Sequence, residues 1–270
     1  MSNGGRLGPL VLPNGASANG LWSLQDAVAF SAANRWPTDF PKTLSGLTLW
    51  LAAHRLTGLN DGDAVGTWPD LSGNGYDVTQ ATAGNKPLYK TNIFNGQPAL
   101  LFDGTNSFMS NSASNPFTAG ASRTVFVACK LLSSGVNTGS TFICFRTTAR
   151  SWVCQQYVDA SNPGLFFTDG TGNNNSISVN GLVFTFGIYC MRGTAGAPGK
   201  FRLNGGNGVA ASGNIIAEAG TTGFFVGRRE TTGGYMNGYI AEIIAYNSEL
   251  SDANCLLVER YLNAKYSPLA

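Results

Sequence analysis

The chain has 270 residues, of which 43% are hydrophobic and 11% aromatic, enough for one large domain with its own core and a short extension. Charged residues make up only 12%, about half the usual share, and the formal net charge is +2. No run of Lys or Arg forms the basic stripe of a nucleic-acid-binding protein, so we expect no nucleic acid partner.

Residues 1–45 differ from the rest and predict an extended arm with one short helix. The first twenty residues are rich in Gly, Pro, Asn and Ala and follow no period. Ser23 can cap a helix that Trp36-Pro37 ends, because the residue before a proline avoids the α conformation. The apolar side chains of this helix need a surface, either a neighbouring subunit, which we favour, or the chain's own core. The candidates for this partner contact are Trp22, Leu24, Val28 and Trp36.

From residue 46 onward, short strands alternate with Gly and Asn turns, which predicts an all-β domain over residues 46–270, built from two packed antiparallel sheets. The first strand has a period of two, since Leu47, Leu49 and Leu51 alternate with other residues. The further strand candidates are residues 98–102, 124–130, 141–146, 151–158, 165–168, 182–191, 200–203, 224–228 and 239–246. The domain closes with a predicted helix that Ser251 caps, over residues 251–262.

The five cysteines are odd in number, and no pair has the CxxC spacing of a zinc or redox site. We therefore expect buried free thiols rather than a disulfide framework. The N-terminus lacks a basic segment followed by an apolar one, and no apolar run reaches the roughly 18 residues of a membrane span. These features predict synthesis in a host cytoplasm, without a signal peptide or a membrane partner.

Several segments resemble the concanavalin A-like, or laminin G-like, jelly-roll domain: GLTLWL at 46–51, WPDLSGNG at 68–75, NGQPALLFDG at 95–104, GYIAEIIAY at 238–246 and VERYL at 258–262. The resemblance covers residues 46–266 and implies a two-sheet jelly-roll sandwich. It implies little about function, because this fold serves lectins, glycanases and spacers alike. Many relatives carry an acid after Trp-Leu, where this chain has Ala52-Ala53.

The segment GLWSLQDA at residues 20–27, with Trp36-Pro37, resembles a short N-terminal segment of phage structural proteins. This second resemblance implies a virion protein that the arm attaches to other virion proteins. We predict a tail fibre or other receptor-binding part that binds a host surface glycan, and tail adhesins of this kind are commonly homotrimers. The alternatives are a capsid decoration protein and the carbohydrate-binding module of a secreted protein.

The sequence contains no recognisable catalytic set, so we predict a non-enzymatic protein, with a glycanase as the remaining enzyme alternative. Its 15 acids include no Glu-x-Asp-x-Glu arrangement that would place two carboxyls in one cleft. Glu242, the only acid in its strand, is expected to be an outward polar residue or a satisfied buried carboxylate. His54 is the only histidine, and the sequence has no Gly-x-Ser-x-Gly nucleophile motif with which it could form a catalytic triad.

Two groups of residues are candidates for ligand binding. Calcium would be bound first by Asp70 and Asp77, although loops rich in Asp, Asn and Gly favour simple turn formation, and we expect no other cofactor. A sugar ring would stack on aromatic side chains in polar stretches, for which packing in the core or at its rim is the alternative. These aromatic candidates are Tyr76, Trp152, Tyr157 and Tyr235.

Overall fold

The computed structural model describes residues 39–118, 121–132, 140–147, 151–158, 163–168, 174–177, 186–206, 209–214, 221–229 and 234–267. Within residues 146–177, and at 209, 211–214 and 221–222, the description covers the backbone alone. The predicted partner-binding residues Trp22, Leu24, Val28 and Trp36 lie outside the described residues.

The described residues of the domain form two antiparallel eight-stranded sheets, which we name sheet A and sheet B. Sheet A has the order β14-β13-β12-β7-β16-β5-β4, and β1 also pairs with β16. Its strands are β1 Leu47–Ala52, β4 Leu88–Phe94, β5 Gln97–Asp103, β7 Arg123–Leu131, β12 Gly187–Gly193, β13 Pro198–Leu203, β14 Val209–Asn214 and β16 Asn237–Tyr246.

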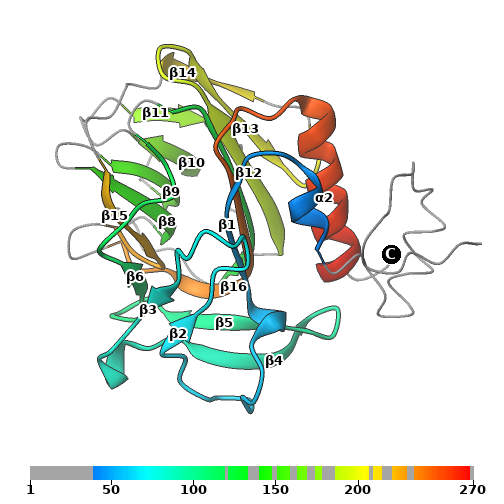
Figure 1. Cartoon of the computed structure of the whole chain (residues 1–270). Helices are drawn as coiled ribbons and strands as arrows, with labels where there is room; N and C mark the ends of the chain where they lie inside the picture. Colours follow the sequence, from blue (N-terminus) through cyan, green and yellow to red (C-terminus); the bar gives the residue numbers. More distant parts are fainter. Residues whose placement is uncertain are drawn as a thin grey trace, which may run out of the picture.

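Sheet B has the order β11-β10-β9-β8-β15-β6-β3-β2. Its strands are β2 Thr67–Trp68, β3 Val78–Thr79, β6 Met109–Asn111, β8 Ser140–Thr147, β9 Ser151–Val158, β10 Pro163–Thr168, β11 Asn174–Ile177 and β15 Thr221–Val226. Strands distant in sequence alternate in both sheets, because the chain crosses repeatedly from one sheet to the other, as Figure 1 shows.

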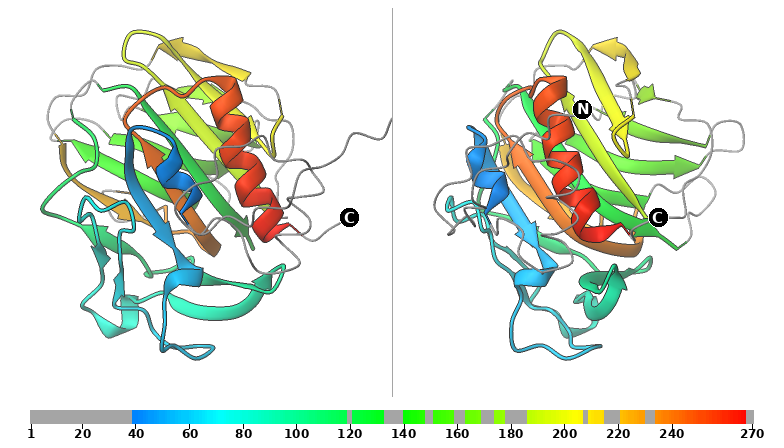
Figure 2. Two further views of the ribbon diagram at one scale, coloured as in Figure 1. Left: turned by 45° about the vertical axis from the view of Figure 1, so that its right-hand side comes forward. Right: turned by 90° about the vertical axis from the view of Figure 1, so that its right-hand side faces the viewer.

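The helix α2, Asp252–Tyr266, lies along the face of sheet A that points away from sheet B (Figures 1 and 2). Ser251 caps it as predicted, since its hydroxyl accepts a hydrogen bond of 3.2 Å from the backbone N–H of Asn254. Three short 3-10 turns also occur among the described residues: η1 Phe40–Thr43, η2 Ala53–Arg55 and η3 Ala83–Asn85. In the described part of the chain, no helix has the length and apolar character needed to cross a membrane.

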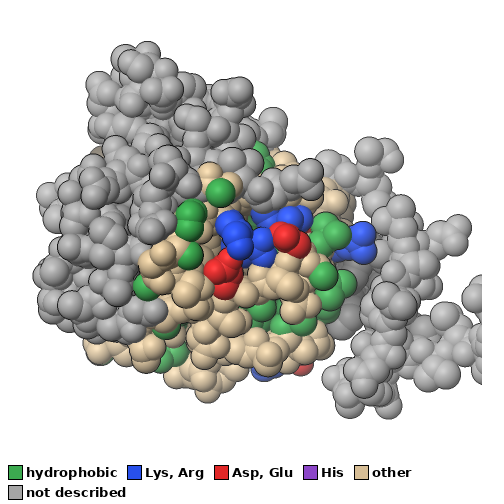
Figure 3. Space-filling view, turned by 90° about the horizontal axis from the view of Figure 1, so that it is seen from above, with side chains coloured by type: hydrophobic (Ala, Val, Ile, Leu, Met, Phe, Trp, Pro, Cys, Tyr) green, Lys and Arg blue, Asp and Glu red, His purple; other side chains and the backbone are tan. Residues whose placement is uncertain are grey.

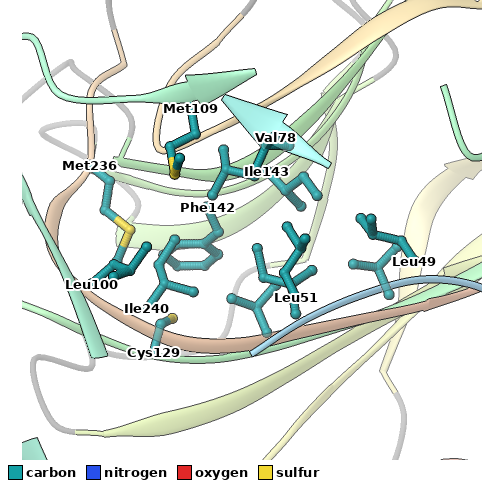
Figure 4. Packing of buried hydrophobic residues seen from close by; sticks show 14 of the residues in the cluster. Leu49, Leu51, Val78, Leu100, Met109, Cys129, Phe142, Ile143, Met236 and Ile240 are labelled. Atoms are coloured by element: carbon teal, nitrogen blue, oxygen red, sulfur yellow. The ribbon is translucent and has the colours of Figure 1, made fainter. Parts of the chain in front are cut away.

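Strands β1, β7, β12 and β16 of sheet A are buried on both faces, and successive residues of each strand point to opposite sides. In β1, Leu49 and Leu51 belong to the core between the sheets, whereas Trp50 belongs to the core under α2. Figure 4 shows the inter-sheet core, where side chains of sheet A meet those of sheet B. Its labelled residues are Leu49, Leu51, Leu100, Cys129 and Ile240 from sheet A, Val78, Met109, Phe142 and Ile143 from sheet B, and Met236.

Part of the predicted arm packs on the domain. Pro41 is buried, and its carbonyl accepts a 3.0 Å hydrogen bond from the Tyr246 hydroxyl. Phe40 stacks on Tyr261 of α2 with ring centroids 5.2 Å apart. Residues 39–45 therefore help to cover α2, and the predicted boundary at residue 45 stays a prediction.

The predicted fold class, a sandwich of two antiparallel sheets closed by a C-terminal helix, is confirmed. The expectation of buried free thiols is also confirmed for Cys129, Cys144, Cys190 and Cys255. The fifth cysteine, Cys154, lies in β9, where only the backbone is described.

Candidate functional site

An aromatic cluster lies on the face of sheet B that points away from the inter-sheet core. Phe224 of β15 belongs to the inter-sheet core, so its neighbour Phe225 points to the opposite face. There Phe225 packs with Cys144 of β8 and with the partly buried Phe108, which precedes β6. The guanidinium carbon of Arg228 lies 3.7 Å from the ring centroid of Phe108 and 4.7 Å from that of Phe225. The two rings therefore hold the guanidinium by cation–π contacts.

The connection from β15 to β16 carries this arginine. Gly227 directly follows β15 with a φ of +84°, and its carbonyl accepts a 2.9 Å hydrogen bond from the N–H of Met236. Arg228 and Arg229 therefore start one arm of the connection, and Gly234 and Tyr235 end the other. The stem of Arg229 crosses close to Gly234, because a Cβ at Gly234 would lie 2.9 Å from the Cγ of Arg229.

We call Phe108, Phe225, Arg228, Arg229 and Tyr235 the arginine–aromatic site. Tyr235, a predicted carbohydrate-binding residue, is partly exposed and is included because it precedes Met236, whose N–H donates to the carbonyl of Gly227, next to Arg228. Sequence reasoning missed the other four. A detectable signal was the doublet Phe224-Phe225, because adjacent strand residues face opposite sides and one of the two rings must leave the main core.

The two arginines of the site have no acid partner in the described part of the chain. Arg228 and Arg229 are partly buried, and the Nε–H of each is buried without a hydrogen-bond acceptor among the described residues. By contrast, Arg202 of β13 binds Glu259 of α2 through Nε, at 3.0 and 3.2 Å from the two carboxylate oxygens. Because these Nε–H groups are buried, the Nη groups are the donors with which the two arginines can bind hydroxyl or carboxylate oxygens of a ligand.

Most other charges near α2 are paired. Asp252 accepts hydrogen bonds from both Arg192 and Arg202, and Glu249 accepts from Lys200 at 2.8 Å. Seen from above, acidic and basic side chains gather side by side on the described part of the surface (Figure 3). This mixed pairing is typical of structural ion pairs rather than of an anion-binding surface.

The predicted calcium candidates organise the loop between β2 and β3. The carboxylate of Asp70 accepts hydrogen bonds from the backbone N–H of Trp50, Ser72 and Tyr76 at 2.9, 2.9 and 3.0 Å, and one of 2.7 Å from the Ser72 hydroxyl. Asp77 accepts from the N–H of Asp70 at 2.7 Å. The four hydrogen bonds to Asp70 match the roughly four lone-pair positions of a carboxylate. This arrangement supports the role of the loop as a turn, and calcium binding stays a prediction.

Of the other carbohydrate candidates, only Tyr76 has a described side chain, so a shared site with Trp152 and Tyr157 stays a prediction. Tyr76 is half-buried against the inter-sheet core, and within the described residues no hydrogen bond or ring contact joins it to Tyr235. Trp152 and Tyr157 lie in β9, opposite Phe145 of β8 and Gly164 of β10 respectively, and their side chains are outside the description.

Glu242 is the satisfied buried carboxylate that the sequence left as one of two options. It is fully buried between β16 and α2, and it accepts hydrogen bonds from Trp50 Nε1 at 2.6 Å, Tyr261 at 3.0 Å, Tyr266 at 2.6 Å and Lys265 at 2.7 Å. Burial raises the pKa of Glu242, but the charge of Lys265 and the hydrogen bonds outweigh it, so the pKa is lowered. This carboxylate holds α2 on sheet A and is closed to a substrate.

His54 lies at the edge of the same network, in η2. Its Nδ1 is 3.3 Å from the Tyr266 hydroxyl. Burial lowers the pKa of His54 to about 4, and the charge of Lys265 adds to this effect while Glu242 opposes it. The imidazole is therefore neutral at pH 7 and serves the packing of α2.

No protein-family model matches the chain, and no curated protein matches it. Solved structures match it by fold. Domain 4 of AbnA, a GH43 extracellular arabinanase from Geobacillus stearothermophilus in complex with arabinotriose, matches with a TM-score of 0.59 at 13% identity, over 79% of this chain and 98% of that one. The sialidase of Trypanosoma rangeli in complex with sialic acid gives 0.57 at 12% identity, over 89% and 38%.

The receptor-binding domain of botulinum neurotoxin type G gives a TM-score of 0.53 at 13% identity, over 80% of this chain and 51% of that one. The chain thus spans almost all of the arabinanase domain, but about two-fifths of the sialidase and half of the neurotoxin domain. At these identities the likeness establishes the fold alone. The chain is a β-sandwich of the architecture that occurs in enzymes as well as in binding domains.

Proposed function

We propose that the chain is a non-catalytic glycan-recognition module that binds its ligand at the arginine–aromatic site. The observation that carries the proposal is the guanidinium of Arg228, held over the rings of Phe108 and Phe225 and without a carboxylate partner among the described residues. Fold neighbours that bind sugars add support, since one is in complex with arabinotriose and another with sialic acid.

The chemistry of the site favours an acidic sugar. A sugar ring presents an apolar face to an aromatic ring, and Phe108 and Tyr235 supply partly exposed rings. Arginine donors bind a carboxylate through two parallel hydrogen bonds, and a cation without a partner gains most from an anionic ligand. We therefore infer a preference for glycans that carry a carboxylate, such as a uronic or sialic acid.

We infer a non-catalytic protein from the surroundings of its carboxylate side chains. Glycoside hydrolysis by acid–base catalysis needs two carboxyl groups that flank the glycosidic bond. Glu242 is enclosed by four hydrogen-bond donors, and both carboxylate oxygens of Asp70 accept hydrogen bonds from backbone N–H groups. Neither of these two is free to act as an acid or a nucleophile.

Attachment to a virion, as a tail fibre, receptor-binding part or capsid decoration, stays a prediction that rests on residues 20–37. The fold neighbours favour the carbohydrate-binding alternative, and the neurotoxin domains among them favour adhesion to a receptor. A glycan-recognition module can belong to a secreted protein or to an adhesin. The binding site can therefore be tested without knowing which of the two this chain is.

The proposal is tested by isothermal titration of the full chain with sialyllactose and oligogalacturonate, each compared with neutral lactose and arabinotriose. We expect an acidic glycan to bind more tightly than the neutral ones. Arg228→Ala should weaken this binding by about 10- to 100-fold, because hydrogen bonds to charged groups contribute about 1.5–3 kcal/mol. The affinity of the Arg228→Lys variant, which keeps the charge but lacks the planar guanidinium, should lie between that of the unchanged protein and that of the Arg228→Ala variant.

The matched control is Arg260→Ala, since Arg260 is exposed on α2, which packs on the outer face of sheet A, whereas the site lies on the outer face of sheet B. It should bind like the unchanged protein. Equal affinity of the Arg228→Ala and Arg260→Ala variants for the acidic glycan would contradict the proposed site. Release of reducing ends from any of these glycans would contradict the non-catalytic function.

A further inference from the structure

Two cysteines face each other where α2 begins. Cys190 lies in β12, and Cys255 lies in the first turn of α2. Both are fully buried free thiols, and their sulfur atoms are 3.9 Å apart, with the thiol of Cys190 donating to that of Cys255. The two residues are 65 positions apart in the sequence, so the fold alone brings them together.

The surroundings of the two thiols differ. The Nη1 of Arg192 lies 3.5 Å from the sulfur of Cys255, which also sits near the positive end of α2. The hydrogen bond from Cys190 lowers the pKa of Cys255, and the charge of Arg192 lowers it further, while burial opposes both. Burial raises the pKa of Cys190. Cys255 is therefore the thiol that more readily becomes a nucleophilic thiolate.

We propose that Cys190 and Cys255 form a peroxide-oxidisable dithiol, whose disulfide fastens the first turn of α2 to β12. A disulfide needs a sulfur–sulfur distance of about 2.05 Å, which small side-chain rotations and a slight shift of the helix start can provide. α2 covers the outer core of sheet A, so the bond fixes the element on which that core depends.

The oxidant is a hydroperoxide, and the reaction balances in two steps. The thiolate of Cys255 attacks one peroxide oxygen, the oxygen–oxygen bond breaks, and hydroxide leaves, which gives a sulfenic acid. The sulfur of Cys190 then attacks the sulfur of Cys255, the sulfur–oxygen bond breaks, and the thiol proton leaves with the hydroxide as water. Overall, two thiols and one hydrogen peroxide give one disulfide and two waters.

Access to the buried pair requires opening of the first turn of α2. Helix ends open at lower free energy than the rest of a fold. The N-cap Ser251 is exposed, and Asp252, which ties Arg192 to the helix, is 72% exposed. Oxidation of the pair by peroxide is therefore expected to be slower than that of a surface thiol. It should become faster in the Asp252→Ala variant, which lacks the ion pair between Asp252 and Arg192.

The test treats the full chain with hydrogen peroxide and analyses it under non-reducing conditions. Peptide mass spectrometry with fragmentation should find Cys190 linked to Cys255, and this needs no variant. The melting temperature should rise by about 5 °C or more, because a bond that closes a long loop restricts the unfolded chain, and dithiothreitol should reverse the rise. Cys255→Ser should abolish both effects.

The matched control is Cys129→Ala, which removes a buried thiol of the inter-sheet core and should leave the linkage and the temperature rise in place. Two results would overturn the proposal. One is that Cys190 and Cys255 of the folded chain both remain thiols under peroxide conditions that oxidise the cysteines of the unfolded chain. The other is linkage of either cysteine to Cys129, Cys144 or Cys154 instead.

Discussion

Glu242→Ala is expected to lower the free energy of unfolding by about 3–5 kcal/mol, the cost of leaving a buried charge without its partner. Lys265 is 8% exposed and donates to Glu242 at 2.7 Å, so the substitution leaves its ammonium buried without a counter-charge, with the Tyr261 hydroxyl at 2.9 Å as its remaining hydrogen-bond partner. The Nε1 of Trp50 also loses its acceptor. Urea denaturation at pH 7 measures the change.

The control for this prediction is Glu249→Ala, which breaks an ion pair with Lys200 whose members are 22% and 46% exposed. Such a pair contributes about 1 kcal/mol or less. Replacing both members of the buried pair, Glu242→Leu with Lys265→Met, should destabilise less than Glu242→Ala, because no unpaired charge remains. A loss for Glu242→Ala no larger than that for Glu249→Ala would mean that the network does not hold α2.

Acid is expected to weaken the fold through His54 between about pH 6.5 and pH 4. The folded pKa of His54 is about 4, below its ordinary 6.5, so in this window the unfolded chain binds a proton that the folded chain does not. Stability therefore rises with pH across the window, and lowering the pH from 7 to 5 should cost about 2 kcal/mol. The groups facing His54 are Tyr266, Lys265, Glu242 and Arg55.

His54→Asn checks this assignment, because the chain has no other histidine. Its amide can take the place of Nδ1 beside the Tyr266 hydroxyl, and it does not titrate. The variant should lose much less stability than the unchanged protein between pH 7 and pH 5. Glu242, whose pKa is lowered, contributes its own loss only further down, as the pH falls from about 4.5 through the folded pKa. Equal losses in both proteins would exclude His54 as the cause.

Much of the fold could be predicted from the sequence, because long apolar strands and helix caps leave local signals. The alternation of Leu49 and Leu51 with Trp50 identified β1, and the two-sided burial of sheet A explains why residues on both faces are apolar. Ser251 located the start of α2 correctly, although the helix runs four residues beyond the predicted end, to Tyr266. The predicted strand 224–228 ends earlier, because Gly227 adopts a positive φ.

The short strands of sheet B were missed for a physical reason. β2 and β3 have two residues each and β6 has three, too few to show a period. The partners of Glu242 also lacked a local signal, since Trp50, Tyr261, Lys265 and Tyr266 come from two distant elements. The same applies to Arg228 and Phe108, which meet only after β15 pairs with β6.

The central claim, that an acidic glycan binds at the arginine–aromatic site, is tested most directly by an NMR titration of the full chain with sialyllactose and with oligogalacturonate. Binding of either should shift the amide signals of Gly227–Arg229 and Gly234–Met236 first, together with those of β6. Shifts confined to α2 or to the Trp68–Asp77 loop, or none with either acidic glycan, would contradict it.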